Sequence, residues 1–245
     1  MITTPARLNL SGQVVQDLGR RIVGGELEPG EPLPAVETLC EQLGVSRTVI
    51  REAVKSLAAR GLVDSRPKRG TVVRAAEHWN FLDPLVLAWQ EETHDDGRHL
   101  FHLTELRQAI EPAAAAMAAE RAPDEALRRI EEAARQLDES VDDVEAFLAA
   151  DLRFHTEILH ATGNPLFAPV ANVIGAYLGS SLRVTNRQPE DNRASVPIHQ
   201  KVARAICDRA PARARSAMKA HLDHAAARLE RALDASKAGR GPSPH

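Results

Sequence analysis

Aromatic residues are scarce in this chain of 245 residues, which holds two Trp, one Tyr and five Phe. Ala, Leu, Arg and Glu dominate instead, and this composition favours helices packed on helices. The two cysteines, Cys40 and Cys207, lie too far apart in sequence for a metal or redox motif. No apolar run approaches the roughly 18 residues of a membrane helix, and the N-terminus lacks the layout of a signal peptide. We therefore expect a soluble protein of the reducing cytoplasm.

Charge is distributed unevenly along the chain. The formal net charge is −3, yet the segment from Gly44 to Arg74 holds eight basic side chains and two acidic ones. A local basic patch on a mildly acidic protein suggests a polyanion as the partner of one face. Because a charged segment is also typical of an ordinary solvated surface, charge alone does not decide between the two.

The N-terminal part of the chain has the element order of a DNA-binding fold. Apolar residues at helical spacing predict helices over 9–27 and, after a connection rich in Gly and Pro, over 36–43. Gly44 suits a tight turn, and Ser46 suits the N-cap of a further helix that ends before Gly61. The segments LVDS and TVVR then alternate like two short strands around the basic tip RPKRG.

This order predicts a winged helix-turn-helix domain, which we place at residues 1–76. The second helix of the motif lies in the major groove, where Arg can donate to guanine and Ser or Thr can contact phosphates or bases. A short basic wing suits the DNA backbone or the minor groove. Each side chain taken singly also suits a surface ion pair, and their order along the chain favours DNA. The candidate DNA contacts are Ser46, Arg47, Thr48, Arg51, Lys68 and Arg69.

The segment LPAVETLCEQLGVSRTVIREAVKSLAARGLV resembles the winged helix-turn-helix of the GntR family of bacterial regulators. The resemblance covers the whole N-terminal domain, and it implies that Arg47, Thr48, Arg51 and Gly70 occupy operator-contact positions. Many members of the family carry Arg where this chain has Glu37. A carboxylate facing DNA repels phosphate or accepts from cytosine, so we expect an operator that differs from the usual sequence of the family.

Residues 77–236 are expected to form a second, all-helical domain. Signals from Gly, Pro and Asn separate its helices, and no alternating strand pattern interrupts them. The spacing favours an antiparallel bundle with short connections, so the fold class is mainly α. Residues 237–245 have the composition of a disordered tail. The predicted helices are 84–92, 98–119, 123–138, 143–161, 165–185, 193–208 and 211–235.

Four residues of this domain form a candidate metal site. Asp151 and His155 are four residues apart, so both project from one face of one helix. His199 and His221 lie on separate helices, which a bundle can bring together. One carboxylate and three imidazoles suit a divalent ion, with zinc favoured and nickel, iron or manganese as alternatives. The chain has ten histidines, and a lone histidine is more often a surface or core residue, so spacing alone leaves both interpretations open.

The segments ELRQAIEPAAAAMAAERA, DLRFHTEILHATGNPLF and IHQKVARAICDRAPARARSAMKAHLDHA resemble the ligand-binding (FCD) domain of the FadR subgroup of GntR regulators. The resemblance implies that Asp151, His155, His199 and His221 coordinate the ion. It also implies that Arg107 reaches toward a carboxylate effector, which a guanidinium can grip through two hydrogen bonds. The alternative for Arg107 is a surface pair with Glu105 or Glu111. Asn172 is a further candidate for the effector cavity.

The segment WNFLDPLVLAW is similar to the one that follows the wing in regulators of sugar-acid (galactonate-type) catabolism. This similarity implies a polyhydroxylated carboxylate as effector, while a dicarboxylate or another small acid stays open. The resemblances imply a homodimer that represses a catabolic operon and leaves its operator when the effector binds at the metal. The alternatives are a purely structural ion and a metal-dependent enzyme. No separate general base or nucleophile motif supports an enzyme.

Overall fold

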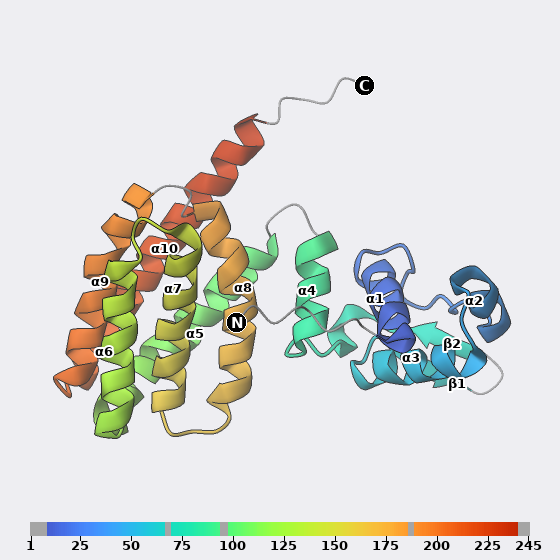
Figure 1. The fold of residues 1–245 in the computed structure, drawn as a ribbon, viewed down its shortest axis with the longest axis horizontal. Helices are drawn as coiled ribbons and strands as arrows, with labels where there is room; N and C mark the ends of the chain where they lie inside the picture. Colours follow the sequence, from blue (N-terminus) through green and yellow to red (C-terminus); the bar gives the residue numbers. More distant parts are fainter. Residues whose placement is uncertain (1–8, 67–69, 94–97, 186–188, 240–245) are drawn as a thin grey trace. The chain divides into compact units, whose positions relative to one another are not determined.

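The computed structural model describes residues 9–66, 70–93, 98–185 and 189–239 (Figure 1). The chain forms two compact units, Met1–Asp95 and Asp96–His245. The described residues contain ten α-helices and one two-stranded sheet, so the mainly α fold class is confirmed. None of the helices in these ranges has both the length and the apolar character needed to cross a membrane.

The first unit contains the predicted helix-turn-helix. Helix α1 (Leu10–Val23) packs its apolar stripe on α3 (Arg47–Ala59), and α2 (Val36–Leu43) also packs on α3. Gly44 ends α2 with φ at 65°, a left-handed conformation that Gly adopts without a steric penalty. The Ser46 hydroxyl caps α3 by accepting from the Val49 amide at 3.4 Å. The first helix ends at Val23 and not at residue 27 as predicted, because Gly24 and Gly25 end it. The other two predicted helices, the turn glycine and the N-cap are confirmed.

The wing is an antiparallel hairpin of β1 (Val63–Arg66) and β2 (Gly70–Val73), with Val63 opposite Val73. Its tip, residues 67–69, lies outside the described residues. A short 3₁₀ helix, η1 (Ala76–His78), follows the hairpin. Next to it, the Trp79 indole donates to the carbonyl of Arg74 at 3.0 Å, which fixes the chain behind the wing.

Helix α4 (Pro84–Thr93) belongs to the first unit and not to the helical domain of residues 77–236, where it was expected. It packs on α1 through Trp89, which is fully buried. The Trp89 indole donates to Gln16 Oε1 at 2.7 Å, so its one polar atom is satisfied. A Cβ on Gly19 would lie 2.5 Å from the Trp89 ring, so only Gly allows this close approach of α1 and α4.

The second unit is a bundle of long helices. Helix α5 packs against α10 and α7, while α6 packs against α7 and α9, so segments far apart in sequence lie side by side (Figure 1). The predicted helices are confirmed with small changes at their ends. Helix α10 continues to Gly239, into the segment expected to be a disordered tail, and residues 240–245 lie outside the described residues. The helices are α5 (Arg98–Arg121), α6 (Asp124–Glu139), α7 (Val144–Ala161), α8 (Phe167–Thr185), α9 (Pro189–Cys207) and α10 (Pro211–Gly239).

The joint between α3 and β1 generates a stability prediction. Gly61 has φ at 77°, and a Cβ there would lie 2.1 Å from the carbonyl oxygen of His78. Gly61→Ala is therefore expected to destabilise the first unit by roughly 1–3 kcal/mol through backbone strain, and further through this collision. Both tryptophans of the chain, Trp79 and Trp89, lie in this unit, so urea unfolding followed by tryptophan fluorescence measures the loss.

The matched control is Gly25→Ala. Gly25 has φ at 79°, and a Cβ there would meet no atom within 4 Å. The control variant therefore has the backbone strain without the collision, and it should lower the free energy of unfolding by less than Gly61→Ala does. Equal losses for the two variants would contradict the role of the contact with His78.

Candidate functional site

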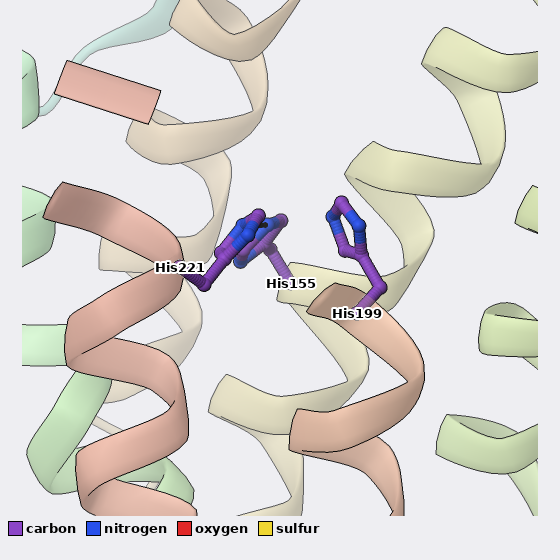
Figure 2. A group of neighbouring side chains, drawn as sticks. All are labelled: His155, His199 and His221. Atoms are coloured by element: carbon purple, nitrogen blue, oxygen red, sulfur yellow. Dashed lines mark hydrogen bonds between the residues drawn. The ribbon is translucent and has the colours of Figure 1, made fainter. Parts of the chain in front are cut away.

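Three helices of the second unit bring the predicted ligands together. Asp151 and His155 lie on one face of α7, while α9 carries His199 and α10 carries His221. All four side chains are buried. One ring nitrogen from each histidine lies within 4.8 Å of the others. Figure 2 shows the three imidazole rings pointing toward one another from their three helices.

The two nitrogens of His199 have different environments. Its Nδ1 lies 2.9 Å from the Ser195 carbonyl and 3.1 Å from the Ser195 hydroxyl, so Nδ1 carries the proton and donates. Its Nε2 lies 2.7 Å from Asp151 Oδ1 but is out of hydrogen-bonding alignment. Among the buried side-chain atoms of the described residues, this Nε2 is the one without a hydrogen-bond partner. A buried lone pair beside a carboxylate suits a bound cation.

His155 is oriented by Glu111, which lies on α5 and is 1% exposed. The Nδ1 of His155 donates to Glu111 Oε2, so its Nε2 keeps a lone pair toward the other histidines. The second oxygen, Oε1, accepts from Arg107 Nε at 2.6 Å. Arg107 Nη2 lies 3.0 Å from His155 Nε2 and 3.4 Å from its Nδ1. These similar distances place the guanidinium nitrogen over the ring and not on the lone-pair axis of Nε2.

The electrostatics of the centre favour ionised acids and a neutral His221. Burial opposes the ionisation of Glu111, but the charges of Arg107 and His155 and their hydrogen bonds outweigh it and lower its pKa to about 2. For Asp151, burial is outweighed by the contact with His199 and its charge, and then by the charges of His155 and Arg107, so the pKa falls to about 2. Burial, assisted by the charges of His199 and His155, lowers the pKa of His221 well below its ordinary value.

These donors fit a metal ion. His155 and His199 are each held by a hydrogen bond from Nδ1, which is the arrangement that orients imidazole ligands around a metal. The Nε2 atoms of His155 and His221 lie 3.3 Å apart, so two lone pairs there repel unless a proton or a cation lies between them. The group close enough to share one ion contains the three histidines, and Asp151 lies beside it with Oδ1 2.7 Å from His199 Nε2. Three imidazoles with a neighbouring carboxylate suit a divalent ion of the zinc type.

The effector candidates lie in different environments. Arg107 pairs with Glu111, as the alternative to effector binding predicted, but the pair is buried and not on the surface. The role of Arg107 in effector binding stays a prediction. Asn172 lies on α8 with an exposed side chain, and its role in effector binding stays a prediction. Sequence reasoning missed Glu111 and Ser195 as partners of the histidines. The spacing of Arg107 and Glu111 by four residues indicates their pairing, but no local pattern links Glu111 to His155.

The DNA-contact candidates lie around the N-terminus of α3. The side chains of Ser46, Arg47, Thr48 and Arg51 are exposed there. The free amides and positive dipole of a helix N-terminus also favour phosphate. Gly70 is exposed in β2 with φ at 74°, and Lys68 and Arg69 lie outside the described residues.

Glu37 lies within reach of the recognition helix. Its Oε1 lies 3.3 Å from Nη2 of Arg47, and both side chains are more than half exposed. An ion pair this exposed contributes at most about 1 kcal/mol to stability. It does hold the candidate base-contacting Arg47 next to a carboxylate.

Two family profiles match the chain. "Bacterial regulatory proteins, gntR family" matches residues 10–73, and "FCD domain" matches residues 102–224. The first match covers the helix-turn-helix and wing, and the second covers all the metal-site candidates. The chain belongs to the GntR family and carries an FCD domain, as the resemblances implied.

Named relatives and a solved structure agree with this assignment. The "Galactonate operon transcriptional repressor" of Escherichia coli is 39% identical over 69% of this chain and 74% of its own length. The "HTH-type transcriptional repressor NanR" of Salmonella newport is 29% identical over 91% of this chain and 86% of its own length. The structure of a Streptococcus agalactiae GntR protein has a TM-score of 0.50 at 27% identity, covering 89% of this chain and 99% of that one.

The chain is therefore a transcriptional regulator of the GntR type, and the enzyme alternative is set aside because its relatives are named as regulators. Regulators of this family bind operator DNA and small-molecule effectors. The structure adds three buried histidines that could hold a metal ion.

Metal binding generates a direct prediction. His199→Ala removes a nitrogen that faces Asp151, so the variant should lose most of its bound zinc after dialysis against a zinc buffer. Metal analysis by mass spectrometry gives the ion content per chain. The control is His160→Ala, which changes an exposed histidine on α7 and should leave the content unchanged. Equal zinc content in the two variants would contradict the site.

Proposed function

We propose that this regulator represses a catabolic operon and releases its operator when a small carboxylate binds at a metal ion in the FCD domain. The observation that carries the proposal is the buried cluster of His155, His199 and His221 with Asp151, beside Arg107. A metal and a guanidinium in one place are the two groups that best bind a carboxylate.

The proposed ion is held by Asp151, His155, His199 and His221, with zinc favoured over nickel, iron or manganese. Such an ion, when bound, supplies positive charge for the oxygen atoms of the effector. The Ser195 carbonyl and Glu111 hold the rings of His199 and His155. Arg107 is anchored through Nε, and its remaining guanidinium N–H groups are the proposed partners of the effector carboxylate.

A sugar acid is the favoured effector. The support is the similarity to a protein named as the repressor of the galactonate operon, because galactonate joins a carboxylate to hydroxyl groups. The hydroxyl next to the carboxylate is the proposed second donor to the ion. A second candidate is a purely structural ion that ties α7, α9 and α10 together while an effector acts elsewhere.

DNA binding is assigned to Ser46, Arg47, Thr48 and Arg51 at the start of α3, and to Lys68, Arg69 and Gly70 of the wing. One such motif makes few base contacts, so the proposed regulator is a homodimer on a two-fold operator in the cytoplasm. The effector favours release only if it binds the released arrangement more tightly, and each tenfold difference in affinity is worth about 1.4 kcal/mol.

Arg107→Ala separates the effector-binding proposal from the structural ion. Losing a charge-assisted hydrogen bond of roughly 2–3 kcal/mol should weaken effector binding by about 30- to 150-fold. The measurement is the galactonate concentration that releases labelled operator DNA at fixed salt. The exposed Arg135→Ala is the control. Release that needs the same concentration in both variants would favour a purely structural ion.

Glu37→Gln tests the DNA-reading surface. The change removes a negative charge near DNA and frees Arg47 from its ion pair, so affinity for duplex DNA should rise by roughly fivefold, or about 1 kcal/mol. Fluorescence anisotropy with operator and unrelated DNA measures it. Glu41→Gln, an exposed neighbour on α2, removes the same charge without touching Arg47. If both variants gain equally, the pair between Glu37 and Arg47 has no specific part in binding.

A further inference from the structure

The buried ionisable side chains of this protein are gathered in one place. Within the described residues, every buried ionisable side chain belongs to the proposed metal site or contacts one of its ligands. None of these side chains is more than 6% exposed. Contacts link them into one network, through Arg107 and Glu111 on one side and Asp151 and His199 on the other. The six are Arg107, Glu111, Asp151, His155, His199 and His221.

The chemistry of these groups defines the charge of the centre. Glu111 accepts through both oxygens, and Asp151 lies against an imidazole, so both act as carboxylates. Histidines that bind a metal do so as neutral imidazoles, and Arg107 contributes one guanidinium charge. Two carboxylates thus face one guanidinium, and the protein supplies one net negative charge. A divalent ion turns this into one net positive charge.

An uncompensated charge is costly in a site closed to water, where opposite charges must pair. A ligand with one carboxylate brings the metal-loaded centre to neutrality. A ligand with two carboxylates leaves an excess negative charge, and a neutral polyol leaves the positive charge unpaired. Arg107 already uses Nε on Glu111, and within the described part of the chain no contact engages its Nη1. One guanidinium is therefore available for one carboxylate.

We propose that this centre selects a monoanionic effector, an acid with a single carboxylate whose other polar groups are uncharged hydroxyls, and that it discriminates against the matching dicarboxylates. The inference rests on the proposed function, in which an acid binds at the metal. It narrows the effector class by the number of carboxylates, and it makes no assumption about the arrangement of the hydroxyl groups.

The test compares ligands that differ mainly in their number of carboxylates. Thermal unfolding of the zinc-loaded full chain is followed while galactonate, galactarate or galactitol is titrated, because these three share one carbon chain and one hydroxyl configuration. Gluconate with glucarate, and lactate with malate, extend the comparison to other skeletons. In every pair that binds, the monoacid should act at a concentration at least about tenfold lower than the diacid, and galactitol should have no effect. The metal-free protein should respond to neither acid.

The outcomes separate the two proposals. A diacid that binds as tightly as its monoacid overturns the charge inference and leaves the metal-bound carboxylate intact. If no acid stabilises the protein, or if His199→Ala responds as the wild type does, the proposed function itself fails.

Glu111→Gln checks the cause of the selectivity. This change removes one negative charge at nearly constant volume. The net positive charge of the metal-loaded centre therefore rises from one to two, which two carboxylates can neutralise. The ratio of diacid to monoacid affinity should rise at least about tenfold, compared at equal measured zinc content. Glu105→Gln, exposed on the same helix, should leave the ratio unchanged. If the Glu111→Gln variant folds and holds zinc but keeps the wild-type ratio of diacid to monoacid affinity, the inference is overturned. If this variant does not hold zinc, the comparison of monoacids with diacids on the wild-type protein tests the inference.

Discussion

The burial of six ionisable side chains inside one helical bundle is the constraint on which the second unit depends. Each such group, left alone, costs several kcal/mol to remove from water. The cost is met only when α5, α7, α9 and α10 bring their groups together at one level of the bundle. A shift of α5 or α9 by one turn against α7 separates Glu111 from His155 or His199 from Asp151. The polar centre therefore favours one register among the many that apolar packing alone permits.

The scarcity of aromatic residues is consistent with this arrangement. Helix α5 buries small side chains, among them Ala114, Ala115, Ala118 and Ala119, so its neighbours can approach closely and surround the centre. Two of the helices that supply polar groups also contain an internal proline, Pro112 on α5 and Pro197 on α9. A proline inside a helix removes a backbone hydrogen bond, so tertiary packing holds both helices against a local preference to break.

Charge has opposite roles in the two units. In the bundle, the pair of Arg107 and Glu111 is shielded from water, so losing one partner strands the other. On the helix-turn-helix, the pair of Arg47 and Glu37 is exposed and stabilises the fold little. An exposed pair can exchange its partner for a phosphate or a base at low cost. The buried pair has a fixed geometry, which suits the binding of a small ligand. The exposed pair can rearrange, which suits contacts with DNA.

Local sequence determined the helices, the turn at Gly44, the Ser46 cap and the alternation of the wing, because spacing and capping act within a few residues. It also placed Asp151 and His155 on one face of α7. Only the tertiary structure decided that α4 packs on α1, that Glu111 holds both Arg107 and His155, and that Ser195 orients His199 for its place beside Asp151. The pair of Arg107 and Glu111 and the bond between Ser195 and His199 each lie within one helix. The other contacts join residues far apart in the chain, and no local pattern encodes which helices become neighbours. Packing of whole helices sets those neighbours, and with them the chemistry of the site.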